Sequence, residues 1–111
     1  MTDESAWARV PLSVTTDTRR TTAMIKLVGD VDSDSAPDVG RVFNDVLASN
    51  PDRIEFDCGD VTYLDSAGIG MLIRCWSSVR DRPAPQVAVT NATPHIVAML
   101  EICGVADTLM T

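Results

Sequence analysis

Apolar and polar residues along the chain follow two different periods, one typical of β-strands and one typical of α-helices. Alternation with β-branched residues predicts strands, and apolar residues spaced three and four positions apart predict amphipathic helices. The first period predicts strands at residues 12–16, 22–28, 53–58, 86–89 and, as a short final strand, 105–110. The second period predicts a first helix with its apolar stripe at 39–47, Pro37 in its first turn and its end at Asn50 and Pro51. It predicts two further helices at residues 66–79 and 94–103. The predicted order is therefore β-β-α-β-α-β-α-β.

Residues that favour helix ends stand at the borders of the predicted helices. Asp34 or Ser35 can cap the first helix, because both side chains accept hydrogen bonds from free backbone N–H groups. Thr93, which stands before a proline, is expected to open the last helix, and Gly104 is expected to end it. A polar turn at 17–21 makes the first two strands an antiparallel hairpin.

This order predicts an α/β fold. Strands that alternate with helices are joined by right-handed crossovers in a mostly parallel sheet, and the opening hairpin makes the sheet mixed. The alternating strands suggest one half-solvated face, so the helices are expected to pack mainly on the other face. Residues 1–111 are interpreted as one domain, with residues 1–10 as a loose tail.

The charge of the chain excludes some classes of partner. Sixteen acidic and nine basic residues give a formal net charge of −7, which argues against binding nucleic acid or anionic lipid. No apolar run is long enough to insert into a membrane, and residues 1–10 lack the apolar core of a signal peptide. The expected location is the cytoplasm.

Cysteine usage argues against a disulfide framework and against a metal site. Cys58, Cys75 and Cys103 are odd in number and form no CxxC pair. They are expected to be buried thiols that pack as small apolar side chains. A thiol-based signal through Cys75 or Cys103 is the alternative interpretation.

The most informative segment is VTYLDSAGIG at residues 61–70, which is expected to lie between the third strand and the second helix. Asp65 and Ser66 are good helix-capping residues, and Gly68 and Gly70 allow close backbone approach. A loop at the carboxyl end of a strand is where ligands and partners tend to meet α/β sheets. A helix N-terminus also favours phosphate. The segment is thus either a plain helix cap or a binding loop.

A second cluster, GDVDSD at residues 29–34, follows the second strand. Its three acids resemble the start of a calcium loop, but the required glycine and distal glutamate do not follow. A solvated turn with a helix cap is the simpler interpretation. Both clusters follow a strand and precede a helix, so we expect them to share one edge of the sheet, as an acidic surface that includes Ser66.

Enzyme chemistry finds little support in the sequence. His95 is the only histidine and stands at a helix start, and the nucleophile-elbow motif is absent. No dinucleotide or phosphate-loop fingerprint surrounds the glycines, so no cofactor is expected. Asp57, Asp60 and Asp65 could form the magnesium pocket of a phospho-receiver domain, but the lysine expected late in such a fold is missing. The chain is therefore predicted not to be an enzyme and to hold no metal.

At these residues the sequence resembles the STAS family (sulphate transporter and anti-sigma factor antagonist), over residues 12–110. IKLVGDVD at 25–32 is similar to the family pattern L-x-G-x-[LIV]-D, and residues 61–70 are similar to its D-S-[ST]-G-[LI]-G loop. Many members continue into a further C-terminal helix, whereas a short strand is expected here.

The resemblance implies a stand-alone anti-sigma factor antagonist. Such a protein binds a GHKL-type serine kinase that otherwise holds a sigma factor inactive. The kinase ends the complex by phosphorylating the hydroxyl residue immediately before the first glycine of the loop. A phosphate adds about −1.5 to −2 charges, which would repel neighbouring acidic groups.

The chain departs from this pattern at the phosphoacceptor position. That position matches Ala67, which has no hydroxyl group, and Ser66 matches the adjacent serine. The protein is therefore expected to bind its partner without phosphorylation. Transfer of the phosphorylation site to Ser66, or a different STAS role, are the alternatives. One such role is that of a STAS subunit that binds the ATPase subunit of a lipid-transporting ABC system.

The loop and the second cluster together give the predicted partner-binding residues. Leu64, Ile69 and Met71 are candidates for apolar contact, and Asp32, Ser33 and Asp65 for polar contact. The full predicted set is Asp32, Ser33, Leu64, Asp65, Ser66, Ala67, Gly68, Ile69, Gly70 and Met71. Asp65→Lys or Gly68→Asp is expected to remove partner binding while the fold survives.

Overall fold

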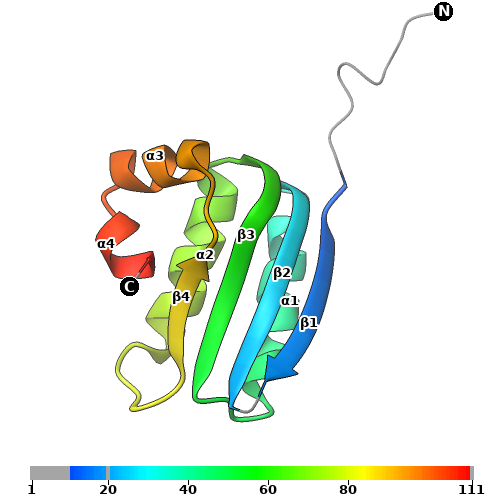
Figure 1. Ribbon diagram of the computed structural model, residues 1–111, viewed down its shortest axis with the longest axis vertical. Coiled ribbons are helices and arrows are strands. Elements are labelled where there is room, and N and C mark those ends of the chain that lie inside the picture. The colour runs from blue at the N-terminus through cyan, green and yellow to red at the C-terminus, as the bar shows by residue number, and fades with distance from the viewer. Residues whose placement is uncertain (1–10, 20, 111) are drawn as a thin grey trace, which may run out of the picture.

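The computed structural model describes residues 11–19 and 21–110, which form four strands and four helices (Figure 1). The predicted tail at residues 1–10 lies outside the described residues. The strands are β1 (Ser13–Arg19), β2 (Thr22–Val31), β3 (Arg53–Leu64) and β4 (Gln86–Thr90). The helices are α1 (Ala36–Leu47), α2 (Ser66–Val79), α3 (Pro94–Ile102) and α4 (Ala106–Leu109).

The sheet has the order β1-β2-β3-β4. β1 runs antiparallel to β2, and the pairs β2–β3 and β3–β4 are parallel, so the predicted mixed sheet is confirmed. α1 and α2 lie against one face of the sheet, behind it in Figure 1, α4 lies beside β4, and α3 lies beyond the end of β4. The predicted α/β class, with helices mainly on one face, is therefore confirmed.

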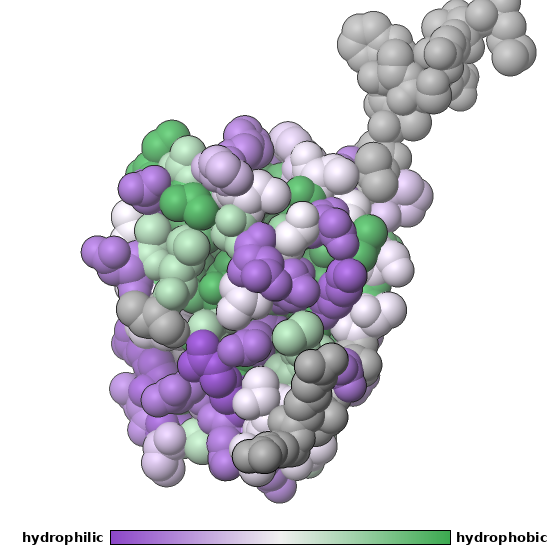
Figure 2. Space-filling view, in the orientation of Figure 1, coloured by the Kyte–Doolittle hydropathy of each residue, from purple (hydrophilic) through white to green (hydrophobic). Residues whose placement is uncertain are grey.

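The core lies between the sheet and the helices, and the alternation of the strands fills it. The largest fully buried side chains include Ile25, Leu27, Phe43, Phe56, Leu64, Leu72 and Leu100. The rings of Phe43 in α1 and Phe56 in β3 stack with centroids 6.0 Å apart, which joins a helix to the sheet. The opposite face carries Lys26, Glu55 and Asp57, and Figure 2 shows mostly polar residues over its middle.

The prediction ended β3 too early. Residues 61–64 are not a loop, because β3 continues to Leu64, and β2 likewise continues to Val31. The register between the two strands shifts twice, between Lys26 and Val28 and between Gly29 and Asp30. Such bulges break the period of two that marks a strand in sequence, so the alternation ends while the pairing continues.

The hairpin and the end of the chain also differ from the prediction. Asp17 belongs to β1, where it pairs with Met24, so the expected turn at 17–21 is shorter. The expected strand at 105–110 is wrong, because these residues form the short helix α4. Gly104, just after α3, has φ +74°. Within the following turn, the Leu109 N–H donates to the Val105 carbonyl at 2.9 Å. Four helical residues are too few to show a helical period in the sequence.

Candidate partner-binding surface

The ends of β2 and β3 bring the two predicted clusters together. Val31 pairs with Leu64, and the Asp65 N–H donates to the Val31 carbonyl at 3.3 Å. The segments at 29–34 and 61–70 therefore lie side by side at one edge of the sheet, as predicted. We call this edge, with the start of α2, the α2-start surface.

Asp65 fixes the start of α2. Its backbone is extended, with φ −104° and ψ −174°, and its Oδ1 accepts a hydrogen bond from the Gly68 N–H at 3.0 Å. This is the N-cap geometry predicted from the sequence, and such a cap stabilises a helix by about 1 kcal/mol. The negative carboxylate also complements the positive end of the helix dipole.

The two glycines of the loop play different structural roles. A Cβ atom on Gly68 would lie 2.6 Å from both the Val31 carbonyl oxygen and Leu64 Cδ1, whereas one on Gly70 would meet nothing within 4 Å. The close approach of β2 and α2 therefore requires a glycine at position 68 but not at position 70. The expectation that Gly70 also allows a close backbone approach is wrong. A side chain at 68 would push β2 and α2 apart, so Gly68→Asp cannot test binding separately from folding.

Asp32 organises the loop between β2 and α1. Its Oδ1 accepts from the backbone N–H groups of Asp34 at 3.0 Å and Ser35 at 3.1 Å. Ser35 stands at the N-cap of α1, but its side chain makes no capping bond, because its hydroxyl oxygen accepts from the Asp32 N–H at 3.0 Å while the hydroxyl donates to the Asp30 carbonyl at 2.8 Å. The predicted side-chain cap from Asp34 or Ser35 is therefore wrong, and the turn is held by Asp32 instead.

Burial divides the predicted contact residues into those that support the loop from inside and those that reach the surface. Leu64, Gly68 and Ile69 are buried, so they hold the loop in place and present no face to a partner. The predicted residues that reach the surface are Ser33 and Ser66, which are exposed, and Asp32, Asp65, Ala67, Gly70 and Met71, which are half-buried.

Sequence reasoning assigned no role to two residues at this edge of the sheet. Tyr63 is 49% exposed although it is aromatic, and it lies beside the loop at the end of β3. Asp30 is buried, and its Oδ1 accepts from the Thr62 hydroxyl at 2.5 Å, which ties β2 to β3 at the same edge. The signal that could have identified Tyr63 is its position as an aromatic residue beside a polar loop. The burial of Asp30 had no signal, because it follows from the bulge.

The thiols fall into two classes. Burial, with the nearby Asp57 carboxylate, raises the pKa of Cys58 to about 12. Burial also raises the pKa of Cys75 to about 11, although the Arg74 guanidinium opposes this shift. Both thiols are protonated at neutral pH and therefore poor nucleophiles. Cys103 follows the end of α3 and is exposed, so the expectation that all three are buried is wrong for this residue.

Among residues 11–19 and 21–110, no group of three His, Cys, Asp or Glu side chains is placed to hold a metal ion. No helix in this part of the chain is long and apolar enough to cross a membrane.

The family described as "Mlab, STAS domain" matches residues 14–111. The chain belongs to the STAS domain family. The similar curated proteins include the anti-sigma-B factor antagonist of Listeria monocytogenes, which is 24% identical over 83 residues that cover 75% of this chain and 72% of that protein.

Solved structures with the same fold agree with this STAS assignment. The anti-sigma factor antagonist from Mycobacterium paratuberculosis superposes with a TM-score of 0.80 at 17% identity, over 89% of this chain and 83% of that chain. The Bacillus cell fate determinant SpoIIAA in its phosphorylated form gives a TM-score of 0.68 at 15% identity, over 89% of each chain. At these identities the likeness shows that the fold is shared.

Proposed function

We propose that this STAS domain is an anti-sigma factor antagonist, a non-enzymatic cytoplasmic protein that binds a kinase-type anti-sigma factor and so releases a sigma factor. The observation that carries the proposal is the α2-start surface, where Asp65 caps α2 and Gly68 packs against β2. The similarity to anti-sigma factor antagonists supports the choice of partner.

The construction of this surface suits it to recognition. Its backbone is held by the Asp65 cap, by the Asp32 turn and by the Thr62–Asp30 bond, so little conformational freedom is lost on binding. Exposed Ser33, Ser66 and Tyr63 offer polar and aromatic contacts above this support. Half-buried Met71 adds an adaptable apolar contact on α2.

We further propose that phosphorylation does not end the complex in the usual way. Ala67, at the position that matches the family acceptor, has no oxygen to carry a phosphate. Ser66 is exposed at the first residue of α2, so it is the only hydroxyl of the loop core at 65–70 that a kinase could reach. We therefore propose an antagonist whose complex is not controlled by phosphorylation. Phosphorylation of Ser66 is the result that would replace this proposal.

The proposal is tested by co-expressing the chain with candidate kinase-type anti-sigma factors and measuring complex formation. Asp65→Lys and Ala67→Glu should each weaken the complex by at least about 100-fold, because both place a new charge on the proposed contact surface. Asp52→Asn, exposed just before the first residue of β3 and so at the other end of that strand, is the matched control and should bind like the wild type. Full binding by both loop variants would overturn the site.

The absence of a hydroxyl at Ala67 favours one second candidate, a STAS subunit that binds the ATPase subunit of a lipid-transporting ABC system. That role needs no phosphorylation, and it would use the same surface. Co-expression with candidate ATPase subunits separates the two functions. A stable ATPase complex together with no binding to any kinase-type anti-sigma factor would favour the transporter role.

A further inference from the structure

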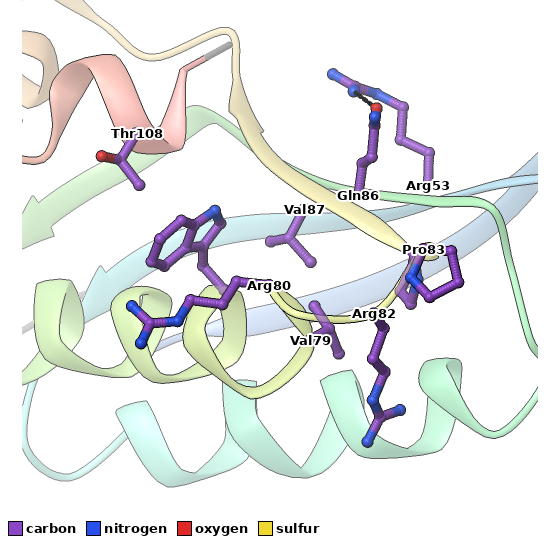
Figure 3. A pocket seen from close by; sticks show the side chains of 10 residues that line it. Arg53, Val79, Arg80, Arg82, Pro83, Gln86, Val87 and Thr108 are labelled. Carbon is purple, nitrogen blue, oxygen red and sulfur yellow. Dashed lines mark hydrogen bonds between the residues drawn. The ribbon is translucent and has the colours of Figure 1, made fainter.

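A pocket of about 470 Å³ lies at the other end of α2, away from the α2-start surface (Figure 3). Its walls come from the end of α2, the 80–85 loop, the first residues of β3 and β4, and Thr108 of α4. We call it the arginine pocket, because Arg53, Arg80 and Arg82 line it, together with Trp76, Val79 and Val87. This volume lies within the range of ligand-binding pockets.

The charge of the pocket opposes the charge of the chain. The protein carries a formal net charge of −7, yet three of its eight arginines line this one pocket, and no lining residue is acidic. Arg53 is already engaged, since its Nε lies 2.8 Å from Glu55 and its Nη1 donates to Gln86 at 3.4 Å. Arg80 and Arg82 therefore decide what the pocket attracts.

The guanidinium groups of Arg80 and Arg82 have little carboxylate compensation. Arg80 Nε lies 4.0 Å from Asp81, whose side chain is 95% exposed, and no ion pair involves Arg82 among residues 11–19 and 21–110. The Arg80 guanidinium carbon lies 5.7 Å from the centre of the Trp76 ring. This cation–π contact positions Arg80 while leaving its N–H donors available to an anion.

The arrangement of the arginines indicates the shape of the ligand. In Figure 3, Arg53, Arg80 and Arg82 point in different directions, and Val79 and Val87 lie between them. A compact oxyanion such as phosphate is held by donors that converge on one point. Donors spread around an apolar floor instead fit an extended ligand that carries several carboxylates and an apolar side chain.

We propose that the arginine pocket docks an acidic peptide segment of a partner protein. An apolar side chain of the segment packs on the half-buried Trp76 ring and on exposed Pro83, and carboxylates beside it pair with Arg80 and Arg82. Guanidinium groups suit this role because their planar N–H donors match carboxylate oxygens. The pocket and the α2-start surface lie at opposite ends of one helix, so this proposal stands independently of the proposed function.

The test is a ¹⁵N NMR titration of the full chain with the peptide Asp-Glu-Leu-Asp-Glu. We expect saturable shifts of the Trp76 indole N–H and of the backbone amides of residues 79–87. The peptide Lys-Lys-Leu-Lys-Lys and inorganic phosphate, at the same millimolar concentrations, should shift these signals far less. Equal shifts with the lysine peptide, larger shifts with phosphate, or no shifts with the acidic peptide would overturn the proposal.

Two independent variants locate the binding. Arg80→Gln and Arg82→Gln should each weaken peptide binding by about ten-fold, the effect of losing one charge-assisted hydrogen bond. Arg74→Gln removes an exposed α2 arginine that does not line the pocket, so it should bind like the wild type. Unchanged affinity in both pocket variants, or an equal loss in Arg74→Gln, would show that the pocket is not the site.

Discussion

The two ends of α2 differ in how they are built. At its start, backbone contacts dominate: Asp65 caps the helix, and Gly68 lies so close to β2 that no side chain fits. At its end, the long side chains of Trp76, Arg80 and Arg82 surround an open pocket. The comparison teaches that one helix can present two kinds of surface, one set by the fixed shape of the backbone and one set by charge on adaptable side chains.

The largest expected effect concerns Gly68 and tests how tightly the start of α2 is packed. Gly68→Ala should lower the free energy of unfolding by about 3 kcal/mol, because its Cβ would meet the Val31 carbonyl oxygen. Gly70→Ala, two residues further along α2, should instead raise that free energy by about 0.5–1 kcal/mol, because alanine favours helix and open space surrounds the site. Urea unfolding of the two variants measures both, and equal effects would show that the start of α2 is not tightly packed.

The next effect concerns the Asp65 cap. Asp65→Ala should lower the free energy of unfolding by about 1 kcal/mol through loss of the bond to the Gly68 N–H, whereas Asp65→Asn should change it little. At the other end of α2, Arg80→Gln should change it by less than about 0.5 kcal/mol, since the side chain is exposed. Thermal unfolding compares the three variants. A larger decrease in the free energy of unfolding for Arg80→Gln than for Asp65→Ala would contradict the expected difference between the two ends of α2.

The smallest effect concerns Cys75, which is buried near the middle of α2. The folded state raises the pKa of this thiol from 9.0 to about 11, so its contribution to stability is complete below pH 9 and is lost as pH rises toward 11. Between pH 8 and pH 10 this thiol should lower the free energy of unfolding by about 0.5–1 kcal/mol, after allowance for solvent screening.

Comparison with Cys75→Ala isolates this effect from the other groups that titrate at high pH. The variant should lose less stability than the wild type over the same pH interval, whatever its stability at pH 8. An identical decrease in the two proteins would show that the Cys75 thiol ionises as readily in the folded state as in the unfolded state.

Much of the fold could be predicted because its elements repeat a short period. Alternation places Ile25 and Phe56 in the core, and the capping residues Asp65 and Thr93 mark the starts of α2 and α3. The end of β3 could not be predicted, because bulges interrupt the alternation before Leu64. The helix α4 could not be predicted either, because it is a single turn.

The two proposed surfaces differ in how far the sequence could reveal them. The α2-start surface could be found from the sequence because its residues lie in two short segments, each between a strand and a helix. The distinction between Gly68 and Gly70 could not, because it depends on the distance to Val31 across the fold. The arginine pocket had no local signal, since Arg53, Arg80 and Thr108 come from separate parts of the chain.

The central claim is that the α2-start surface binds a kinase-type anti-sigma factor and that Ala67 leaves this complex without a phosphorylation switch. The most direct measurement is intact mass and complex content after magnesium and ATP are added to the complexes of the wild type and of Ala67→Ser. The account predicts an unchanged mass and a persistent complex for the wild type, and a phosphorylated, released chain for Ala67→Ser. A phosphate on the wild type that is lost in Ser66→Ala would contradict it.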